Sequence, residues 1–443
     1  MRKFKVRHSK FGSGIILDTR FRGQECLVEF KTGLRMWVSR DELQLFPYLR
    51  PISIKKQSPA EFPEITPLKP IGNQGREVIE AFRMGIVPQT WVKEWTVGRS
   101  HEIATIKTWL HDQTSGTLVI KGGYGSGKSH LLDYLYGYAL ELNYAVAKVG
   151  IDPVSTHMAF PKRVYRSLVQ SMKIPYNGRI LDFREGLVSL AQAGVLTDHG
   201  ILAPFLKALK KGEVVPSMWY WIEGLETSFT KWGVLYDHTT AANIYCYILS
   251  GISHALADVL DLNGLILLFD EAESARIYRY TYEWLRGINF FKALVLTAND
   301  EPDLVEERIV KTESCYRGEC SGLIYSGHRR FPYVYKLPSY LKVVFAVTPD
   351  VSLEKLTSEY NIYTLELGPL NPEILEHFFY RFVELYRKVY GLKISLSEKK
   401  EIFGLIKRYA LFSTRLFIKA MVECLDFKRF YPQKTLKNLG SYF

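Results

Sequence analysis

The chain has 443 residues, of which 47% are hydrophobic and 23% are charged, so about two to four folded domains are expected. No apolar run is long enough to span a membrane, and the basic N-terminus leads into no apolar segment of the kind that a secretory signal contains. Five cysteines are too few for a disulfide framework in so long a chain, which predicts free thiols and a cytoplasmic location.

The formal net charge of +12 is concentrated near the N-terminus. Residues 1–56 carry 13 basic and 5 acidic side chains, a net charge of +8. A basic unit of this size favours a polyanionic partner, usually nucleic acid, so DNA is the expected partner. A basic surface that is merely solvated, and a docking surface for an acidic protein, are the alternatives.

Residues 1–48 are expected to form a small β-barrel. Short strands separated by turns with glycine and basic residues are predicted at 14–18, 25–30 and 34–39. Phe11 is expected to plug the barrel. The tentative nucleic-acid contacts of the barrel are Arg20, Arg22 and Lys31. The segment from residue 8 to 16 resembles the start of SH3/Tudor-like barrels. Residues 49–75 are expected to form an extended linker, because six prolines lie between positions 47 and 70.

Five short apolar runs in the rest of the chain predict the strands of one sheet. They are residues 117–121, 145–149, 265–269, 342–348 and 363–367. Each lacks a polar alternate face, as strands buried on both sides of a parallel sheet do. Helical stretches between them predict an α/β core over residues 76–367. The gap of more than 100 residues between the second and third runs predicts a helical insertion at about 161–261. Helical periodicity after residue 367 predicts a helical lid over 368–443.

A phosphate-binding loop is predicted directly after the first of these strands. Residues 122–129, GGYGSGKS, fit the pattern GxxxxGK[ST], and a helix is expected to begin at His130. The glycines allow backbone N–H groups to surround a phosphate chain at the positive end of a helix dipole. Lys128 is expected to contact the β- and γ-phosphates of ATP, and the Ser129 hydroxyl is expected to bind Mg²⁺.

Two carboxylates stand at the end of the third predicted strand. Asp270 and Glu271 follow the apolar run 265–269, and open α/β sheets bind ligands at the carboxyl ends of their strands. Asp270 is expected to hold Mg²⁺, directly or through water. Glu271 is expected to orient or deprotonate an attacking water molecule. The pair favours ATP hydrolysis over nucleotide binding alone.

Together these motifs resemble the AAA+ ATPases, and more narrowly the P-loop ATP-binding protein of BREX-type phage-defence systems. The second resemblance is carried by residues 82–88, 97–99, 121–132, 269–273 and 345–349 and extends over about residues 75–430. It implies an AAA+ core with five parallel strands. It also implies an ATPase that acts on DNA beside a helicase or other partner, in defence against foreign DNA. The implied nucleotide-contacting residues are Gly98, Arg99, Gly122, Gly123, Tyr124, Gly125, Ser126, Gly127, Lys128, Ser129 and His130.

The AAA+ resemblance also implies roles for three residues outside the loop. Arg99 lies in what looks like the adenine-side segment, and Thr348 is placed like a polar residue that senses the γ-phosphate. Arg415 is placed like a lid arginine that reaches the γ-phosphate of its own subunit. Thr348 and Arg415 complete the expected catalytic set, whose other members are Lys128, Asp270 and Glu271. Ordinary surface, turn and helix-start roles are the alternatives for the three.

One segment departs from the ring-forming AAA+ pattern, because residues 349–362 contain no arginine that could act as a finger on a neighbouring subunit. Candidates elsewhere are Arg276, Arg279, Arg286, Arg308, Arg329 and Arg330. The sequence therefore leaves two hypotheses open. One is a hydrolysing ATPase, with or without a homo-oligomeric ring. The other is an ATP-controlled switch or scaffold with little turnover.

Residues 308–342 interleave basic and aromatic side chains, a pattern that can follow a phosphate backbone and stack on bases. Arg329 and Arg330 are the tentative nucleic-acid contacts here, and an insertion whose aromatic rings pack on the core is the alternative. Cys315, Cys320 and His328 lie in the same segment, but their spacing is not a standard zinc pattern, so a zinc site is not expected.

Overall fold

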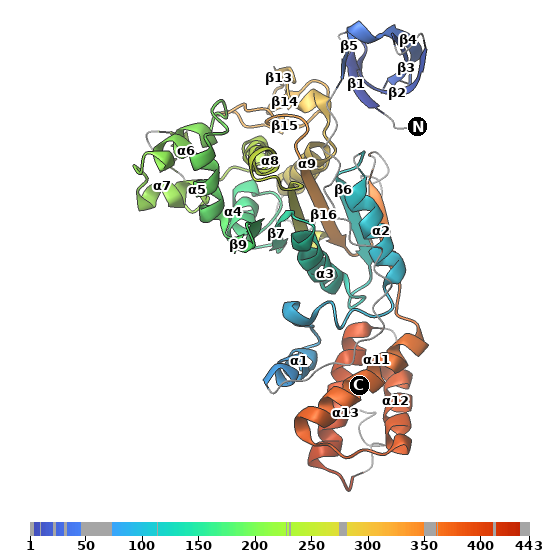
Figure 1. Cartoon of the computed structure of the whole chain (residues 1–443). Helices are drawn as coiled ribbons and strands as arrows, with labels where there is room; N and C mark the ends of the chain where they lie inside the picture. Colours follow the sequence, from blue (N-terminus) through green and yellow to red (C-terminus); the bar gives the residue numbers. More distant parts are fainter. Residues whose placement is uncertain are drawn as a thin grey trace.

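The computed structural model describes residues 4–8, 10–20, 24–30, 33–45, 73–112, 114–226, 228–229, 232–273, 281–349, 360, 362–410 and 413–434. Most of the predicted proline-rich linker lies outside these residues. Among the residues described, no helix is both long enough and apolar enough to cross a membrane. Figure 1 shows the whole chain, coloured along the sequence.

The N-terminal unit is a five-stranded antiparallel sheet in the order β4-β3-β2-β1-β5. Its strands are β1 (Phe4–His8), β2 (Gly12–Arg20), β3 (Glu25–Phe30), β4 (Arg35–Ser39) and β5 (Leu43–Leu45). Alternate residues of β3, among them Val28 and Phe30, are buried in its small core. The prediction that Phe11 plugs this unit is wrong. Its side chain is 36% exposed and packs on the rings of His8 and Phe30.

The central sheet has five parallel strands in the order β17-β6-β16-β12-β7, the arrangement of an AAA+ α/β core. The strands are β6 (Thr117–Gly122), β7 (Ala145–Gly150), β12 (Leu265–Asp270), β16 (Leu341–Val347) and β17 (Tyr363–Leu367). All five predicted strands are therefore present in one sheet. One detail of the prediction is wrong. β17 lies at the edge of the sheet and is not buried on both sides, because exposed Thr364 and Glu366 alternate along it with buried Leu365 and Leu367.

Successive side chains of a strand point to opposite faces of the sheet, and both faces are covered by helices. Leu118 and Ile120 of β6 pack with α2 (Ser100–His111) and α3 (Lys128–Glu141). Val119, between them, belongs to the core on the other face, with α4 (Pro161–Ser171), α8 (Ala242–Val259) and α9 (Thr281–Ala298). This double burial explains why the sequence of the strands is so uniformly apolar.

The segment between β7 and β12 is largely helical, as expected from its length. Besides α4 and α8 it contains α5 (Phe183–Ala193), α6 (Leu202–Lys210), α7 (Pro216–Ile222) and the short hairpins β8–β9 (Ile174–Tyr176, Arg179–Leu181) and β10–β11 (Ser228–Phe229, Gly233–Val234). A three-stranded sheet of β13 (Ile309–Lys311), β14 (Tyr316–Gly318) and β15 (Ile324–Tyr325) follows α9.

The C-terminal bundle contains a helix from the other end of the core. It consists of α11 (Pro372–Tyr390), α12 (Leu396–Ala410) and α13 (Thr414–Phe430), and α1 (Asn73–Arg83) packs against α11 and α13 (Figure 1). In the shared core the Phe82 ring stacks on Phe378 and Phe382, and the Trp95 ring packs edge-on against all three. The bundle therefore combines a helix that precedes the strands of the central sheet in the sequence with three helices that follow them. We call these three C-terminal helices the lid.

Candidate nucleotide-binding site

The predicted phosphate loop connects β6 to the start of α3, at the carboxyl edge of the sheet. Gly125 and Gly127 have φ angles of 75° and 101°, in the left-handed region that glycine adopts without strain. A Cβ built on Gly123 or Gly127 would meet nothing within 4 Å, so the concave side of the loop is open. The loop therefore has the backbone conformation and the space that a phosphate chain requires.

Lys128 begins α3, and its ammonium group is buried under the loop. Its Nζ donates to the carbonyl oxygens of Gly122 (2.7 Å) and Gly123 (3.2 Å) and to Thr348 Oγ1 (3.3 Å). The Thr348 hydroxyl in turn donates to Glu273 Oε1 at 2.6 Å. Among the residues described, no carboxylate pairs with Lys128. A buried cation that is held only by neutral acceptors is available to a bound anion.

The predicted acid pair lies on the same edge of the sheet. Asp270 ends β12, and Lys148 of the neighbouring strand β7 places its Nζ 3.8 Å from Asp270 Oδ2 and 2.7 Å from Asp133 Oδ1. Glu271 is exposed and has a φ angle of 52°, a conformation that costs free energy in a residue with a Cβ. Its backbone N–H donates to Asp270 Oδ1 at 3.1 Å, which fixes the turn between the two carboxylates.

Arg99 lies just before α2 and contacts the phosphate loop. Its guanidinium is almost completely buried beneath the phosphate loop, where Nη2 donates to the carbonyl oxygens of Ser126 (2.8 Å) and Gly368 (3.1 Å). Nη1 donates to Glu102 Oε1 at 2.7 Å. Arg99 therefore connects the loop to the segment after β17. An ordinary surface charge, the alternative for this residue, is excluded by its burial.

The lid contacts the phosphate loop directly. Arg415, in the first turn of α13, donates from Nη1 to the Tyr124 hydroxyl at 3.0 Å. A Cβ on Gly125 would lie 2.3 Å from Ser413 Oγ, so only glycine fits where the lid meets the loop. Ser413 caps α13, since its hydroxyl accepts from the Leu416 N–H. Nucleotide in the loop and the position of the lid are therefore geometrically linked.

Most of these groups line one pocket between the sheet edge and the lid. It includes most of the predicted site: Arg99, Tyr124, Gly125, Ser126, Gly127, Lys128, Ser129, His130, Asp270, Glu271, Thr348 and Arg415. Gly98, Gly122 and Gly123 of the predicted site are not among its lining residues. Glu273, which the sequence does not single out as a site residue, lines it too. Its lining also includes a set of apolar residues, which we call the apolar end of the pocket: Ile86, Val87, Trp95, Val97, Leu370, Leu375, Phe378 and Ile418. These apolar residues come from two segments, 86–97 and 370–418, that lie more than 270 positions apart, which is why their sequence gives no sign of a common site.

Several buried polar atoms in the pocket have no hydrogen-bond partner among the residues described. They are Trp95 Nε1, Ser126 Oγ, His130 Nδ1 and Glu273 Oε2. Buried polar groups are rarely left unpaired in folded proteins, and exceptions indicate a ligand or water site. Burial also lowers the pKa of His130 to about 4. The pocket lining contains both polar and apolar side chains, and the unpaired atoms belong to both kinds of residue.

Oxygen donors suited to magnesium are present next to the phosphate loop. The Ser129 hydroxyl and the Asp270 carboxylate line the pocket, and Mg²⁺ takes oxygen ligands from one or two side chains together with substrate phosphates. In the described part of the chain no group of three or more His, Cys, Asp or Glu side chains could hold a metal.

Of the tentative nucleic-acid contacts, the structure describes the side chains of Arg329 and Arg330. Arg329 donates from Nη2 to the Trp232 carbonyl at 2.6 Å, whereas Arg330 is exposed and stacks over the Tyr316 ring at 4.2 Å. Tyr325 and Tyr333 are fully buried in the core, so the expectation that they could stack on bases is wrong. Arg20 belongs to β2; Arg22 and Lys31, like Arg276 and Arg279 among the finger candidates, lie outside the described residues.

One comparison with known proteins concerns the segment around the loop. A family model described as "BREX system ATP-binding protein BrxC/D" matches residues 72–180, from the start of α1 to β9. Over this segment the chain resembles the BREX ATP-binding proteins. The predicted resemblance is thereby confirmed. The matched segment contains the phosphate loop, Arg99, Trp95 and His130, but not the acid pair or the lid, which the central sheet brings to the same pocket.

No curated protein matches the sequence. Among solved structures, AMPPCP-bound DnaA from Aquifex aeolicus matches with 13% identity and a TM-score of 0.31, covering 79% of this chain and 69% of that one. The HORMA:CdnC:Trip13 complex of E. coli MS115-1 matches with 11% identity and a TM-score of 0.26, covering 79% and 85%. We draw nothing from these two matches, because their TM-scores are low.

Proposed function

We propose that the chain binds ATP with Mg²⁺ in the pocket between sheet edge and lid, and hydrolyses it. The observation that supports this most is the convergence of several groups on one pocket with an apolar end. They are the phosphate loop, a buried lysine with no carboxylate partner among the residues described, two strand-end carboxylates and a lid arginine. The resemblance of residues 72–180 to the BREX ATP-binding proteins supports the choice of nucleotide.

In this proposal each group acts on a different part of the triphosphate. The loop N–H groups and Lys128 bind phosphate oxygens, so the lysine exchanges its loop carbonyls for a charged partner. Mg²⁺ held by Ser129 and Asp270 supplies positive charge to the phosphates. Glu271 orients the water molecule and accepts its proton. Thr348, between Lys128 and Glu273, lies where a hydroxyl can contact the γ-phosphate.

We further propose that this ATPase works on DNA, with a helicase or another protein partner, in defence against foreign DNA. The support is the net charge of +8 on residues 1–56 together with the BREX resemblance. The N-terminal sheet would contact DNA through its basic residues. If charge reversal of Arg20, Arg22 and Lys31 leaves the DNA isotherm unchanged, the sheet binds a protein instead. A phosphate-contacting surface would lose affinity and show a shallower dependence on salt.

The first experiment is ATP turnover by the purified full chain, alone and with duplex or single-stranded DNA. Lys128→Ala is the blank, since it removes the cation that binds the phosphates. We expect Mg²⁺-dependent hydrolysis that one form of DNA stimulates several-fold. Turnover equal to that of the blank under all conditions would contradict the ATPase proposal, and turnover indifferent to DNA would contradict the DNA-coupled part.

A nucleotide switch with little turnover is the second candidate. The contact between the lid and the loop favours it, because Ser413 and Arg415 touch residues that a bound phosphate would also touch. The variant Glu271→Gln separates the candidates, since it should bind ATP but not hydrolyse it. A switch keeps its function in this variant, measured as assembly with the partner or protection against phage, whereas a hydrolysing motor loses it.

A further inference from the structure

Two residues that line the pocket carry polar atoms with no hydrogen-bond partner among the residues described. Trp95 and His130 both line the pocket, and Trp95 Nε1 and His130 Nδ1 are buried without a hydrogen-bond partner among the residues described. The indole N–H can only donate a hydrogen bond. An imidazole nitrogen can donate or accept, so its role depends on where the proton of the ring lies.

The neighbouring threonine determines the position of that proton. Thr96 Oγ1 lies 2.6 Å from the Val92 carbonyl oxygen and 2.8 Å from His130 Nε2. A carbonyl can only accept, so the single hydroxyl hydrogen of Thr96 is used in the bond to Val92. The hydroxyl oxygen must then accept from Nε2–H. In the neutral ring, which predominates at pH 8, Nδ1 therefore carries a lone pair and no proton.

The residues that line the pocket thus include one buried donor and one buried acceptor without a partner among the residues described. Adenine carries an exocyclic amino group, a donor, beside ring nitrogens that accept, whereas guanine carries a carbonyl oxygen at the corresponding position. The lone pair of His130 Nδ1 complements the amino group and opposes the carbonyl. Trp95 Nε1–H complements a ring nitrogen of the base.

We propose that His130 and Trp95 determine the base specificity of the site, with His130 Nδ1 accepting a hydrogen bond from the exocyclic amino group of adenine. Thr96 is a positioning residue that acts by fixing the tautomer of His130. The inference rests on the proposed function, because it requires the base to occupy the apolar end of the pocket. It adds hydrogen bonds that distinguish adenine from other bases, whereas apolar contact alone would accept any flat ring.

The test compares three nucleotides by calorimetric titration at pH 8 with the full chain. They are ATP, GTP and purine riboside triphosphate, which lacks the amino group. Because an unpaired buried polar group costs roughly as much as a tenfold loss of affinity or more, the unaltered chain should bind ATP at least about tenfold more tightly than either analogue. His130→Phe keeps a ring but removes Nδ1, so ATP and purine riboside triphosphate should then bind equally.

Thr96→Val tests the positioning role without changing a group that touches the base. It frees the imidazole to adopt either tautomer, so the preference for ATP over GTP should fall several-fold while ATP still binds. Thr108→Val is the matched control, since Thr108 makes the same hydroxyl-to-carbonyl bond four residues back in its helix and does not line the pocket. The control should keep the full preference.

The outcomes for the inference and for the proposed function are distinguishable. If the unaltered chain binds all three nucleotides equally, the inference is wrong and the proposed nucleotide site stands. If it binds none, both fail. If His130→Phe binds ATP and purine riboside triphosphate with the original difference, His130 does not contact the amino group. Should His130→Phe fail to fold, the nucleotide series on the unaltered chain and on Thr96→Val still gives the answer.

Discussion

Arg415 of the lid and Tyr124 of the phosphate loop are joined by a hydrogen bond of 3.0 Å from guanidinium to phenolic oxygen. The tyrosine side chain is 78% exposed, so this contact competes with water and can be exchanged for a stronger one. A γ-phosphate in the loop offers Arg415 a charged acceptor in place of a neutral one. The pair therefore provides a way for the lid to respond to nucleotide.

We expect Arg415→Ala to lower kcat for ATP by about tenfold or more, the effect of losing one charged contact to the transferred phosphate. Tyr124→Phe, which keeps the ring and removes only the hydroxyl, should change kcat and KM by no more than a few-fold. Steady-state kinetics of the two variants provide the measurement. An equal loss in both variants would mean that the contact itself, and not the release of Arg415, matters.

Thr348 is expected to act on turnover rather than on binding. Its hydroxyl accepts from Lys128 and donates to Glu273 at the sheet edge. Thr348→Val preserves the shape of the side chain and removes both bonds, so kcat should fall about tenfold with ATP affinity changed only a few-fold. Equilibrium binding and single-turnover hydrolysis separate the two quantities. If both stay unchanged, Thr348 is only the turn residue that its position before Pro349 also allows.

Lys342 gives a prediction about pH. Its Nζ is buried and donates to the carbonyl oxygens of Trp109, Asp112 and Ser115, at the end of α2. Burial lowers the pKa of Lys342 to about 8, below its value in the unfolded chain. Between these two pKa values the unfolded chain binds more protons, so this residue makes the free energy of unfolding rise with pH from about 8 to about 10.

The variant Lys342→Met removes this contribution. The difference in free energy of unfolding between the unaltered chain and Lys342→Met should therefore grow as the pH rises from 8 to 10, while other titrating groups cancel. Denaturant titrations at several pH values measure it. The exposed Lys107 is the control, because it lies on α2, the helix that contains the Trp109 carbonyl bound by Lys342. Lys107→Met should give a difference that does not change with pH. A constant difference for Lys342→Met as well would refute the prediction.

The parts of the structure that the sequence predicts are those that depend on neighbouring residues. The strand 265–270 is apolar at every buried position, and the loop 122–129 requires its glycines for local backbone reasons, so both are visible in the sequence. The N-terminal strands β1 and β5 are too short to give a pattern of their own. They form because each pairs with another strand, β5 on β1 and β1 on β2.

Features that depend on distant contacts could not be predicted. The position of Arg99 is set by carbonyl oxygens of Ser126 and Gly368, which the chain order does not place beside it. The apolar end of the pocket joins Ile86 to Ile418 only because α1 packs on the lid. The same reason explains why α1, expected to begin the α/β core, lies in the helical bundle instead.

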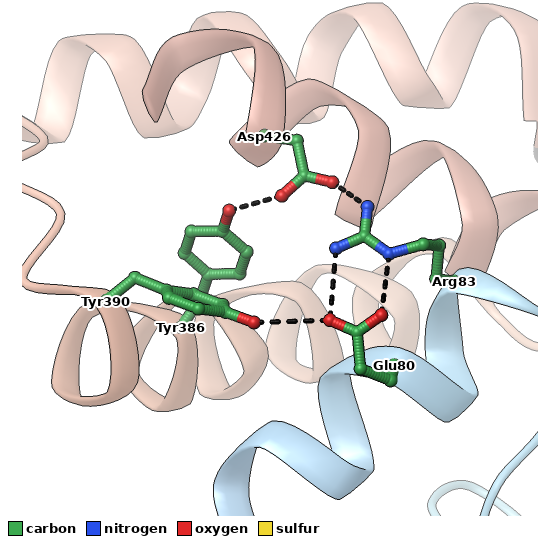
Figure 2. Close-up of polar contacts among 5 residues, drawn as sticks. All are labelled: Glu80, Arg83, Tyr386, Tyr390 and Asp426. Atoms are coloured by element: carbon green, nitrogen blue, oxygen red, sulfur yellow. Dashed lines mark hydrogen bonds and ion pairs between the residues drawn. The ribbon is translucent and has the colours of Figure 1, made fainter. Parts of the chain in front are cut away.

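The attachment of α1 to the lid rests on a polar network as well as on apolar packing. Figure 2 shows Arg83 of α1 between Glu80 and Asp426, with Tyr386 donating to Asp426 and Tyr390 donating to Glu80 at 3.2 Å. Asp426 is the centre of this network on the lid side, and its side chain is only 14% exposed. It accepts from both Arg83 and Tyr386, so its charge holds two elements together.

We expect Asp426→Asn to lower the stability of the lid by about 2 kcal/mol, the cost of weakening two partly buried hydrogen bonds of which one is charged. ATP affinity should also fall a few-fold, because α1 leads directly into Gly85, Ile86 and Val87, which line the pocket. Arg387→Gln is the control: its pair with Glu384 is exposed and should contribute less than about 0.5 kcal/mol. Thermal unfolding with and without ATP provides the measurement. If Asp426→Asn lowers the melting temperature but leaves ATP affinity intact, the α1 attachment stabilises the lid without shaping the pocket.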